Sequence, residues 1–165
     1  MSCKNSCDSE FILSPAKSWE LPNLYKLTRI NNLLSVVFYD SETFRMSGFI
    51  KLMESCSARV ITKGSRYLGY IWFTGAKANA AEIHFCFFPG FTSEMYKQAG
   101  IFILDSLKLH RETKSEEPYF IYGLIPEFNR KAIRFGEKLG FTKTGILPNF
   151  VQSMRQNLVL LCREL

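Results

Sequence analysis

Two ionisable side chains stand on one strand-like segment at a spacing that places them side by side. Residues Ala81 to Phe87 read AEIHFCF, and the two-residue period of a β-strand puts Glu82 and His84 on the same face. Both side chains can accept a proton, and burial raises the pKa of a carboxyl group toward the range in which it works as a general base. The segment therefore predicts a base on Glu82, with His84 as the alternative base.

Structural roles for the same two residues also fit the pattern. Glu82 fits an exposed position at the start of a strand, or one partner of an internal ion pair, because burying an unpaired charge is costly. His84 lies on an apolar strand and fits a core histidine whose ring nitrogens are hydrogen-bonded. The chemical role of either residue therefore depends on where this strand lies in the fold.

A second motif, NRKAIRFGEKLGF, runs from Asn129 to Phe141. It predicts a short amphipathic helix, because its apolar residues recur at helical spacing. Asn129 can cap the helix at its start, and Gly140 stands where a left-handed C-cap is needed. A strand-like run from Tyr119 to Ile125 precedes the helix. A hairpin is expected from Phe141 to the C-terminus, so the helix connects two parts of a sheet.

The rest of the chain supplies the elements that must position these residues. In chain order they are an extended piece at Glu10 to Ser14, a helical region at Pro22 to Leu34, a helix capped by Ser41, strands at Ala58 to Thr62, Tyr67 to Thr74 and Ala81 to Phe88, and a helix at Ser93 to His110. The complete order is β-α-α-β-β-β-α-β-α-β-β. It predicts the α/β (α+β) class, with helices on both sides of a mixed sheet.

Length and composition limit the class of protein. The chain has 165 residues, of which 47% are hydrophobic and 15% aromatic, and this predicts one well-packed domain over residues 1–165. Residues 1–8 are expected to form a flexible N-terminus. No uninterrupted apolar run is long enough to span a membrane, and the N-terminus has no signal-like apolar core. A soluble, cytoplasmic protein is therefore expected.

Cysteines and net charge bear on the possible ligands. The five cysteines are odd in number and scattered, which favours reduced thiols. Cys3 and Cys7 have no second Cys/His pair to complete a zinc site, so no metal site is predicted. The net charge of +6 fits a solvated basic face, a polyphosphate cofactor or an acidic substrate. No basic run is interleaved with aromatic residues, which argues against nucleic acid.

The helix motif resembles a known family. Its pattern N-x-x-A-x-x-F-x-E-K-L-G-F, after Pro126, is similar to the last helix of the GNAT N-acetyltransferase superfamily. The strand motif A-E-I-x-F-C resembles the fourth strand of the histone-acetylating branch, in which the glutamate is the general base. The predicted order of elements is also the GNAT order. The resemblance therefore extends over essentially the whole chain, although its specific motifs lie in the second half.

The resemblance implies a fold, a co-substrate and site residues. It implies a mixed, mostly antiparallel central sheet flanked by helices, and transfer of an acetyl group from acetyl-CoA to a primary amine of a small molecule or a protein. Glu82 would deprotonate the incoming amine. Backbone groups near Phe87 and Phe88 would hold the pantetheine arm between the two central strands. Asn129 matches the family asparagine that contacts the pantetheine, although a plain helix N-cap explains it equally well.

The chain departs from the family where the phosphates of acetyl-CoA bind. GNAT proteins usually carry Q/R-x-x-G-x-G/A after the fourth strand, and no register of the segment Pro89 to Gly100 gives this pattern. Thr92 or Ser93 can still cap the following helix and leave backbone amides for an anion. Lys97 lies one turn further on, where its ammonium group can reach a phosphate. The predicted cofactor site therefore comprises Phe87, Phe88, Thr92, Ser93, Lys97 and Asn129.

A second departure concerns the group that protonates the leaving thiolate. Many GNAT proteins have a tyrosine at the position of Gly136, within the last helix. Tyr122 or water would then supply the proton. Glycine in a helix costs about 1 kcal/mol relative to alanine, so Gly136 is expected to permit a close approach of backbone or ligand. The two departures leave an alternative function: a catalytically silent GNAT-fold module for binding or assembly.

Overall fold

The computed structural model describes residues 10–38, 42–77, 79–114, 118–151 and 156–165. The predicted flexible segment 1–8 and the predicted capping residue Ser41 lie outside these ranges. The helices are α1 (Leu21–Ile30), α2 (Leu34–Val37), α3 (Met46–Ser55), α4 (Ser93–Lys114) and α5 (Arg130–Lys138), with a short 3-10 helix at Glu42–Phe44. The strands are β1 (Phe11–Pro15), β2 (Arg59–Lys63), β3 (Arg66–Lys77), β4 (Ala80–Phe87), β5 (Phe120–Pro126), β6 (Thr142–Val151) and β7 (Gln156–Glu164).

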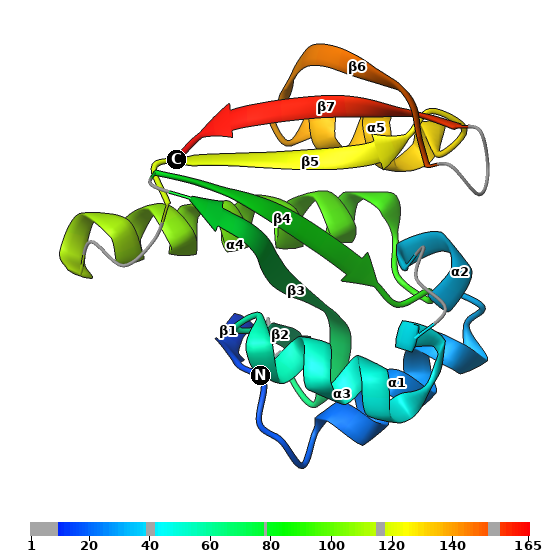
Figure 1. Ribbon diagram of the computed structural model, residues 1–165. Helices are drawn as coiled ribbons and strands as arrows, with labels where there is room; N and C mark the ends of the chain where they lie inside the picture. Colours follow the sequence, from blue (N-terminus) through cyan, green and yellow to red (C-terminus); the bar gives the residue numbers. More distant parts are fainter. Residues whose placement is uncertain (1–9, 39–41, 78, 115–117, 152–155) are drawn as a thin grey trace.

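One sheet of seven strands forms the centre of the described structure, in the order β1-β2-β3-β4-β5-β7-β6 (Figure 1). Each neighbouring pair is antiparallel except β4 and β5, which are parallel. The predicted class, a mixed and mostly antiparallel sheet flanked by helices, is confirmed. The predicted helical region at Pro22 to Leu34 comprises α1 and the start of α2, with a turn between them. Asn32 takes a left-handed conformation with φ 55°, which ends α1 and turns the chain into α2.

Side chains of β4 alternate between two cores, one on each face of the sheet. Cys86 belongs to the core beneath α1 and α3, and Ile83 belongs to the core beneath α4. Phe135 of α5 packs against this second core. The predicted faces of β4 are therefore confirmed, with the ionisable residues on the side of α1 and α3 and the phenylalanines on the side of α4 and α5.

Both ends of α5 are capped as the sequence predicts. The side-chain oxygen of Asn129 accepts a hydrogen bond from the backbone N–H of Ala132 at 3.2 Å. At the other end Gly140 has φ +84°. The N–H groups of Gly140 and Phe141 donate to the carbonyl groups of Glu137 and Gly136, at 3.0 and 3.1 Å. This pair of bonds is a Schellman motif, which satisfies carbonyls at the helix end.

The two parallel strands separate after a short contact. β4 pairs with β5 at Ala80–Phe120, Ala81–Ile121 and Glu82–Tyr122, where the described pairing ends. Beyond Glu82, β4 continues along β3 as far as Phe87, while β5 continues along β7. Figure 1 shows β4 and β5 diverging toward the side of the molecule that carries α2 and α5. The sheet therefore opens into a fork directly after Glu82.

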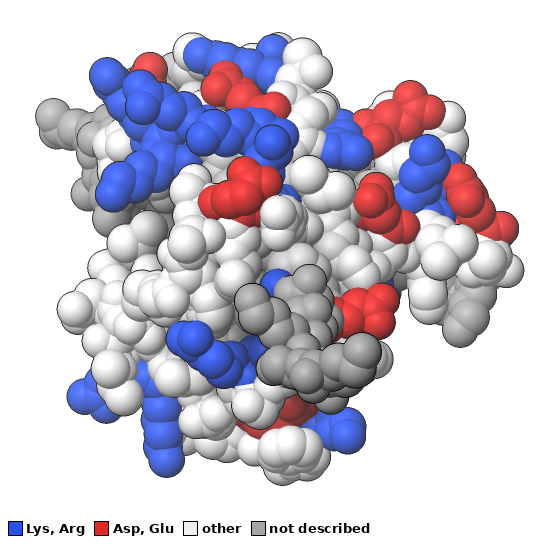
Figure 2. All heavy atoms as spheres, turned by 180° about the vertical axis from the view of Figure 1, so that it is seen from behind, with Lys and Arg blue, Asp and Glu red and all other residues white. Residues whose placement is uncertain are grey.

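Positive charge is concentrated near this fork. Lys and Arg atoms gather at the upper left of Figure 2, over the part of the molecule that contains α5. Arg130, Lys131, Arg134 and Lys138 of that helix are all exposed.

None of the described helices is both long enough and apolar enough to cross a membrane. No group of three or more potential metal ligands lies among the described residues.

Candidate functional site

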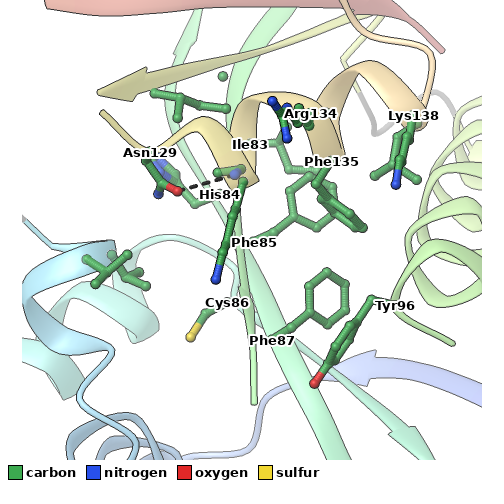
Figure 3. Close-up of a pocket in the computed structure, with 18 of the residues that line it drawn as sticks. Ile83, His84, Phe85, Cys86, Phe87, Tyr96, Asn129, Arg134, Phe135 and Lys138 are labelled. Atoms are coloured by element: carbon green, nitrogen blue, oxygen red, sulfur yellow. Dashed lines mark hydrogen bonds between the residues drawn. The ribbon is translucent and has the colours of Figure 1, made fainter. Parts of the chain in front are cut away.

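A cleft of about 980 Å³ occupies the fork. Its walls come from β4, β5, α2, the start of α4 and one face of α5. Figure 3 shows the residues of β4 running through the cleft, with α5 above them. Of the residues predicted from sequence, the lining includes His84, Phe87, Ser93, Lys97 and Asn129. The cleft thus collects residues that lie on elements far apart in the sequence.

Glu82 lies at the base of the fork, where its carboxylate is hydrogen-bonded on two sides. The hydroxyl of Thr74 on β3 donates to Oε2 at 3.2 Å, and the backbone amide of Leu124 on β5 also donates to the carboxylate. Burial raises the pKa of Glu82, and these two hydrogen bonds oppose that rise. A carboxyl group with a raised pKa holds a proton more readily than an ordinary one, as a general base must.

His84 connects Glu82 to the cleft. Its Nε2 atom lies 2.7 Å from the hydroxyl oxygen of Thr74 and 3.7 Å from Oε1 of Glu82. Its ring stacks on that of Trp72, with 4.6 Å between centroids and 8° between planes. Burial lowers the pKa of His84 to about 4, so the ring is neutral near pH 7. Because the Thr74 proton is donated to Glu82, Nε2–H of His84 donates to Thr74 and Nδ1 carries the lone pair.

Neither Glu82 nor Tyr122 lines the cleft, although the sequence predicts both as catalytic residues. Tyr122 is the register partner of Glu82 on β5. Its hydroxyl lies 3.1 Å from the position that a Cβ at Gly75 would take, on the β3 side of the fork. Burial is the largest cause that raises the pKa of Tyr122. The predicted proton donor is therefore on the paired side of the fork, away from the opening.

The two predicted pantetheine contacts are Phe87, the last residue of β4, and Phe88 directly after it, and their backbone groups point in different directions. The N–H of Phe88 donates to the carbonyl of Leu68 at 2.8 Å, and its carbonyl accepts from the hydroxyl of Tyr96 at 2.9 Å. The N–H of Phe88 therefore faces β3, and its carbonyl is occupied by Tyr96. The residue is buried and does not line the cleft. Successive residues of a strand direct their backbone groups to opposite sides. The backbone groups of Phe87 consequently face the opening toward β5.

The turn between β4 and α4 uses its polar groups internally. Thr92 caps α4, because its hydroxyl accepts the N–H of Met95 at 3.2 Å. The N–H of Phe91 donates to the hydroxyl of Tyr96 at 3.2 Å. Ser93 and Lys97 line the cleft, whereas Thr92 does not. Of the two predicted capping residues, Thr92 is therefore the N-cap of α4. The predicted phosphate-binding residues that line the cleft are Ser93 and Lys97.

Three groups of the site are not predicted from sequence as site residues. Thr74 lies between Glu82 and His84 because β3 and β4 pair in the register Thr74↔Glu82. Trp72, which stacks on His84, also lines the cleft. The cations of α5 that line it are Lys131, Arg134 and Lys138. The cations could be predicted as a group from their spacing along one helix face. Thr74 could not, because its contact with Glu82 depends on the register of the β3–β4 hairpin.

Gly136 admits a side chain from the neighbouring strand. A Cβ at this position would lie 2.6 Å from Cδ1 of Leu161 on β7. The residue is buried and also lines the cleft. The close approach predicted for Gly136 is therefore that of an apolar side chain. Any larger residue, tyrosine included, requires Leu161 to move.

No family model matches the sequence, and no curated protein matches it either. Solved structures do match. The ribosomal L7/L12 α-N-protein acetyltransferase RimL, in complex with CoA, is 14% identical with a TM-score of 0.75, covering 94% of each chain. Spermidine N-acetyltransferase from Vibrio cholerae, in complex with CoA and spermine, is 16% identical with a TM-score of 0.74, covering 94% of this chain and 96% of that one.

A third structure carries the family name. The GNAT-family acetyltransferase from Bacillus anthracis is 12% identical with a TM-score of 0.73, covering 93% of this chain and 94% of that one. All three similarities extend over nearly the whole chain, so they concern the complete arrangement of helices and strands. The predicted resemblance is thereby confirmed at the level of structure, and the chain has the fold of the GNAT N-acetyltransferases.

Proposed function

We propose that this chain transfers an acetyl group from acetyl-CoA to a primary amine. The observation that carries the proposal is the fork between β4 and β5, which opens directly after Glu82 into a cleft of about 980 Å³. A cleft of this size accommodates an extended cofactor arm with a second reactant. The similar structures of RimL and of the Vibrio cholerae enzyme contain CoA, which supports CoA as the shared ligand.

The strand edge in the fork suits the pantetheine arm. Phe87 directs its backbone groups toward the opening, where the amides of an extended arm can pair with them in the manner of an added strand. The side chain of Asn129 accepts the N–H of Ala132 through its oxygen, which leaves the amide nitrogen as a donor to the cleft. Both roles considered for Asn129, helix cap and ligand contact, are therefore compatible.

We assign the acceptor amine to the part of the cleft lined by α2, Trp72 and His84. An amine attacks a thioester only in its neutral form, so a base must take its proton. In the proposed arrangement Nδ1 of His84 accepts that proton, and the chain through Thr74 delivers the equivalent proton to Glu82. Glu82 thus remains the final acceptor, and His84 is the group that contacts the amine.

The bond changes balance without a further reactant. The amine nitrogen bonds to the thioester carbonyl carbon, the C–S bond breaks, and CoA leaves as a thiolate that takes up a proton from water. Glu82 returns its proton to solvent, which restores the base and balances the proton taken by the thiolate. The conjugate base of a thiol with an ordinary pKa near 8.5 is a good leaving group, so the thiolate can depart before it is protonated and a tyrosine donor is not obligatory. This proposal therefore requires no role for Tyr122.

The proposal is tested by an assay of acetyl transfer from acetyl-CoA to amines. Acetyl-CoA is incubated with the protein and a panel of peptides with free N-termini, polyamines and small primary amines, and the acetylated product is detected by mass spectrometry together with released thiol. We expect thiol release that depends on at least one amine. A protein that binds CoA but acetylates no member of the panel would support the silent binding module instead.

A further inference from the structure

One face of α5 presents a row of cations to the cleft. Lys131, Arg134 and Lys138 all line it, and Lys97 lines it from α4. Positions three, four and seven residues apart share one side of a helix, so these three side chains project together. Figure 3 shows Phe135 and Lys138 extending from α5 toward the space that α5 shares with α4. The row is therefore part of the cleft.

These cations have no anionic partner within the described part of the chain. No described carboxylate lies within ion-pair distance of Lys97, Lys131, Arg134 or Lys138. The described cleft lining includes one carboxylate, Glu94, at the start of α4. Four cations and one anion make this end of the cleft strongly positive, which favours a ligand with several negative charges.

The turn before α4 is a poor alternative anion site. A helix N-terminus binds anions through free backbone amides. Here the N–H of Phe91 is bonded to the hydroxyl of Tyr96, and the N–H of Met95 is bonded to the hydroxyl of Thr92. Glu94 adds a negative charge in the first turn. Two donors are therefore occupied and the local charge opposes a phosphate.

Aromatic contacts fix α5 against β4 so that the cations keep their positions. The ring of Phe135 meets that of Phe87 edge to face, with 5.5 Å between centroids and 77° between planes. It meets the ring of Phe85 in the same way, at 6.2 Å and 79°. Because Phe135 lies four residues after Lys131 and three before Lys138, it shares their side of the helix, and these contacts hold the cationic face of α5 over β4.

We propose that Lys131, Arg134 and Lys138 of α5, together with Lys97, bind the diphosphate of CoA in place of the glycine-rich turn. The proposal rests on the proposed function, because it assigns the phosphate end of the same ligand. Guanidinium and ammonium groups form strong charge-assisted hydrogen bonds with phosphate oxygens. The diphosphate contact thereby moves from backbone amides of the β4–α4 turn to side chains, three of them on the opposite wall formed by α5 and one, Lys97, on α4.

The experiment compares CoA, 3′-dephospho-CoA and pantetheine, which lacks phosphate, by calorimetry with a double variant, Arg134→Ala with Lys138→Ala. Arg130→Ala removes an exposed cation of the same helix that does not line the cleft and serves as the matched control. We expect the double variant to weaken both CoA and 3′-dephospho-CoA about tenfold or more and to flatten the salt dependence of the Kd. Pantetheine affinity and the control variant should be unchanged.

Three results would overturn the assignment. They are CoA affinity that is unchanged in the double variant, an equal loss for pantetheine, and a loss that disappears with 3′-dephospho-CoA. A second pair of substitutions, Arg134→Gln with Lys138→Gln, removes the charges but keeps longer side chains of similar helix propensity, so a loss of affinity in both double variants is assigned to charge. Failure of the wild-type protein to bind CoA or pantetheine would contradict the proposed function, which separates that failure from a failure of this inference.

Discussion

At the scale of single residues, Glu82 is the proposed final proton acceptor, and its substitution separates chemistry from structure. Glu82→Gln keeps the shape of the side chain and removes the proton acceptor. We expect turnover to fall about 100-fold or more, the usual scale for a positioned base, with acetyl-CoA affinity retained. Glu137→Gln, on the exposed side of α5 outside the cleft lining, is the matched control. Steady-state kinetics and calorimetry measure the two quantities.

The pH profile provides a second readout of the same variant. Because burial raises the pKa of Glu82, wild-type turnover should fall as the pH drops through that raised pKa and the carboxylate takes up a proton. In Glu82→Gln this acid limb should be absent, and the deficit should shrink at high pH, where solvent supplies neutral amine. If turnover survives Glu82→Gln while His84→Gln abolishes it in a folded protein, the base is His84 alone.

Burial of His84 should make the folding stability of the protein fall as the pH is lowered. Its pKa is lowered in the folded state to about 4, from 6.5, so the unfolded chain binds the proton more readily. Acidification from pH 7 to pH 4 should therefore remove about 2 to 3 kcal/mol of folding stability through this residue. His84→Gln should lose that dependence. Urea unfolding at several pH values measures it, and parallel curves for the two proteins would contradict the assignment.

At the scale of secondary-structure elements, the junction between α5 and β6 depends on Gly140. With φ +84°, an L side chain is strained there, and a Cβ would lie 3.1 Å from Nη1 of Arg163. Gly140→Ala should reduce the free energy of unfolding by about 1 to 2 kcal/mol. Gly145→Ala is the control, since no atom lies within 4 Å of the position that a Cβ would take there. Equal denaturant midpoints for both variants would contradict this account.

The sequence predicts the elements well because most of them depend on local signals. The motif of α5, with its cap at Asn129 and its stop at Gly140, is read from spacing and residue type alone. The faces of β4 follow from the alternation of its side chains. The break between α1 and α2 is not predicted, because Asn32 adopts a left-handed conformation that its residue type only permits. The end of α4 at Lys114 also lies beyond the predicted His110.

The site is less predictable, since it depends on contacts between distant segments. Thr74 meets Glu82 through the register of β3 with β4, which has an irregularity between Thr74 and Lys77. Tyr122 is predicted as a substitute for the tyrosine that many GNAT proteins have at the position of Gly136, and the parallel pairing with β4 places it on the β3 side of the fork. Neither the register nor the point at which β4 and β5 separate is encoded in a local pattern.

At the scale of the whole molecule, the fold and the charge distribution support the same ligand. The sheet opens after Glu82, and a group of Lys and Arg side chains gathers over the wall of that opening formed by α5 (Figure 2). A net charge of +6 is insufficient by itself to define a partner. Its location beside a cleft with a free strand edge is what favours a polyphosphate ligand with an extended arm.

The most direct test of this account is a calorimetric titration of the wild-type protein with acetyl-CoA. We expect saturable binding of one molecule per chain. A ligand specific for the folded state should also raise folding stability by about 2.7 kcal/mol at a hundredfold excess over its Kd. The absence of binding heat at millimolar acetyl-CoA, measured at two temperatures so that a vanishing enthalpy is not mistaken for no binding, would contradict the central claim.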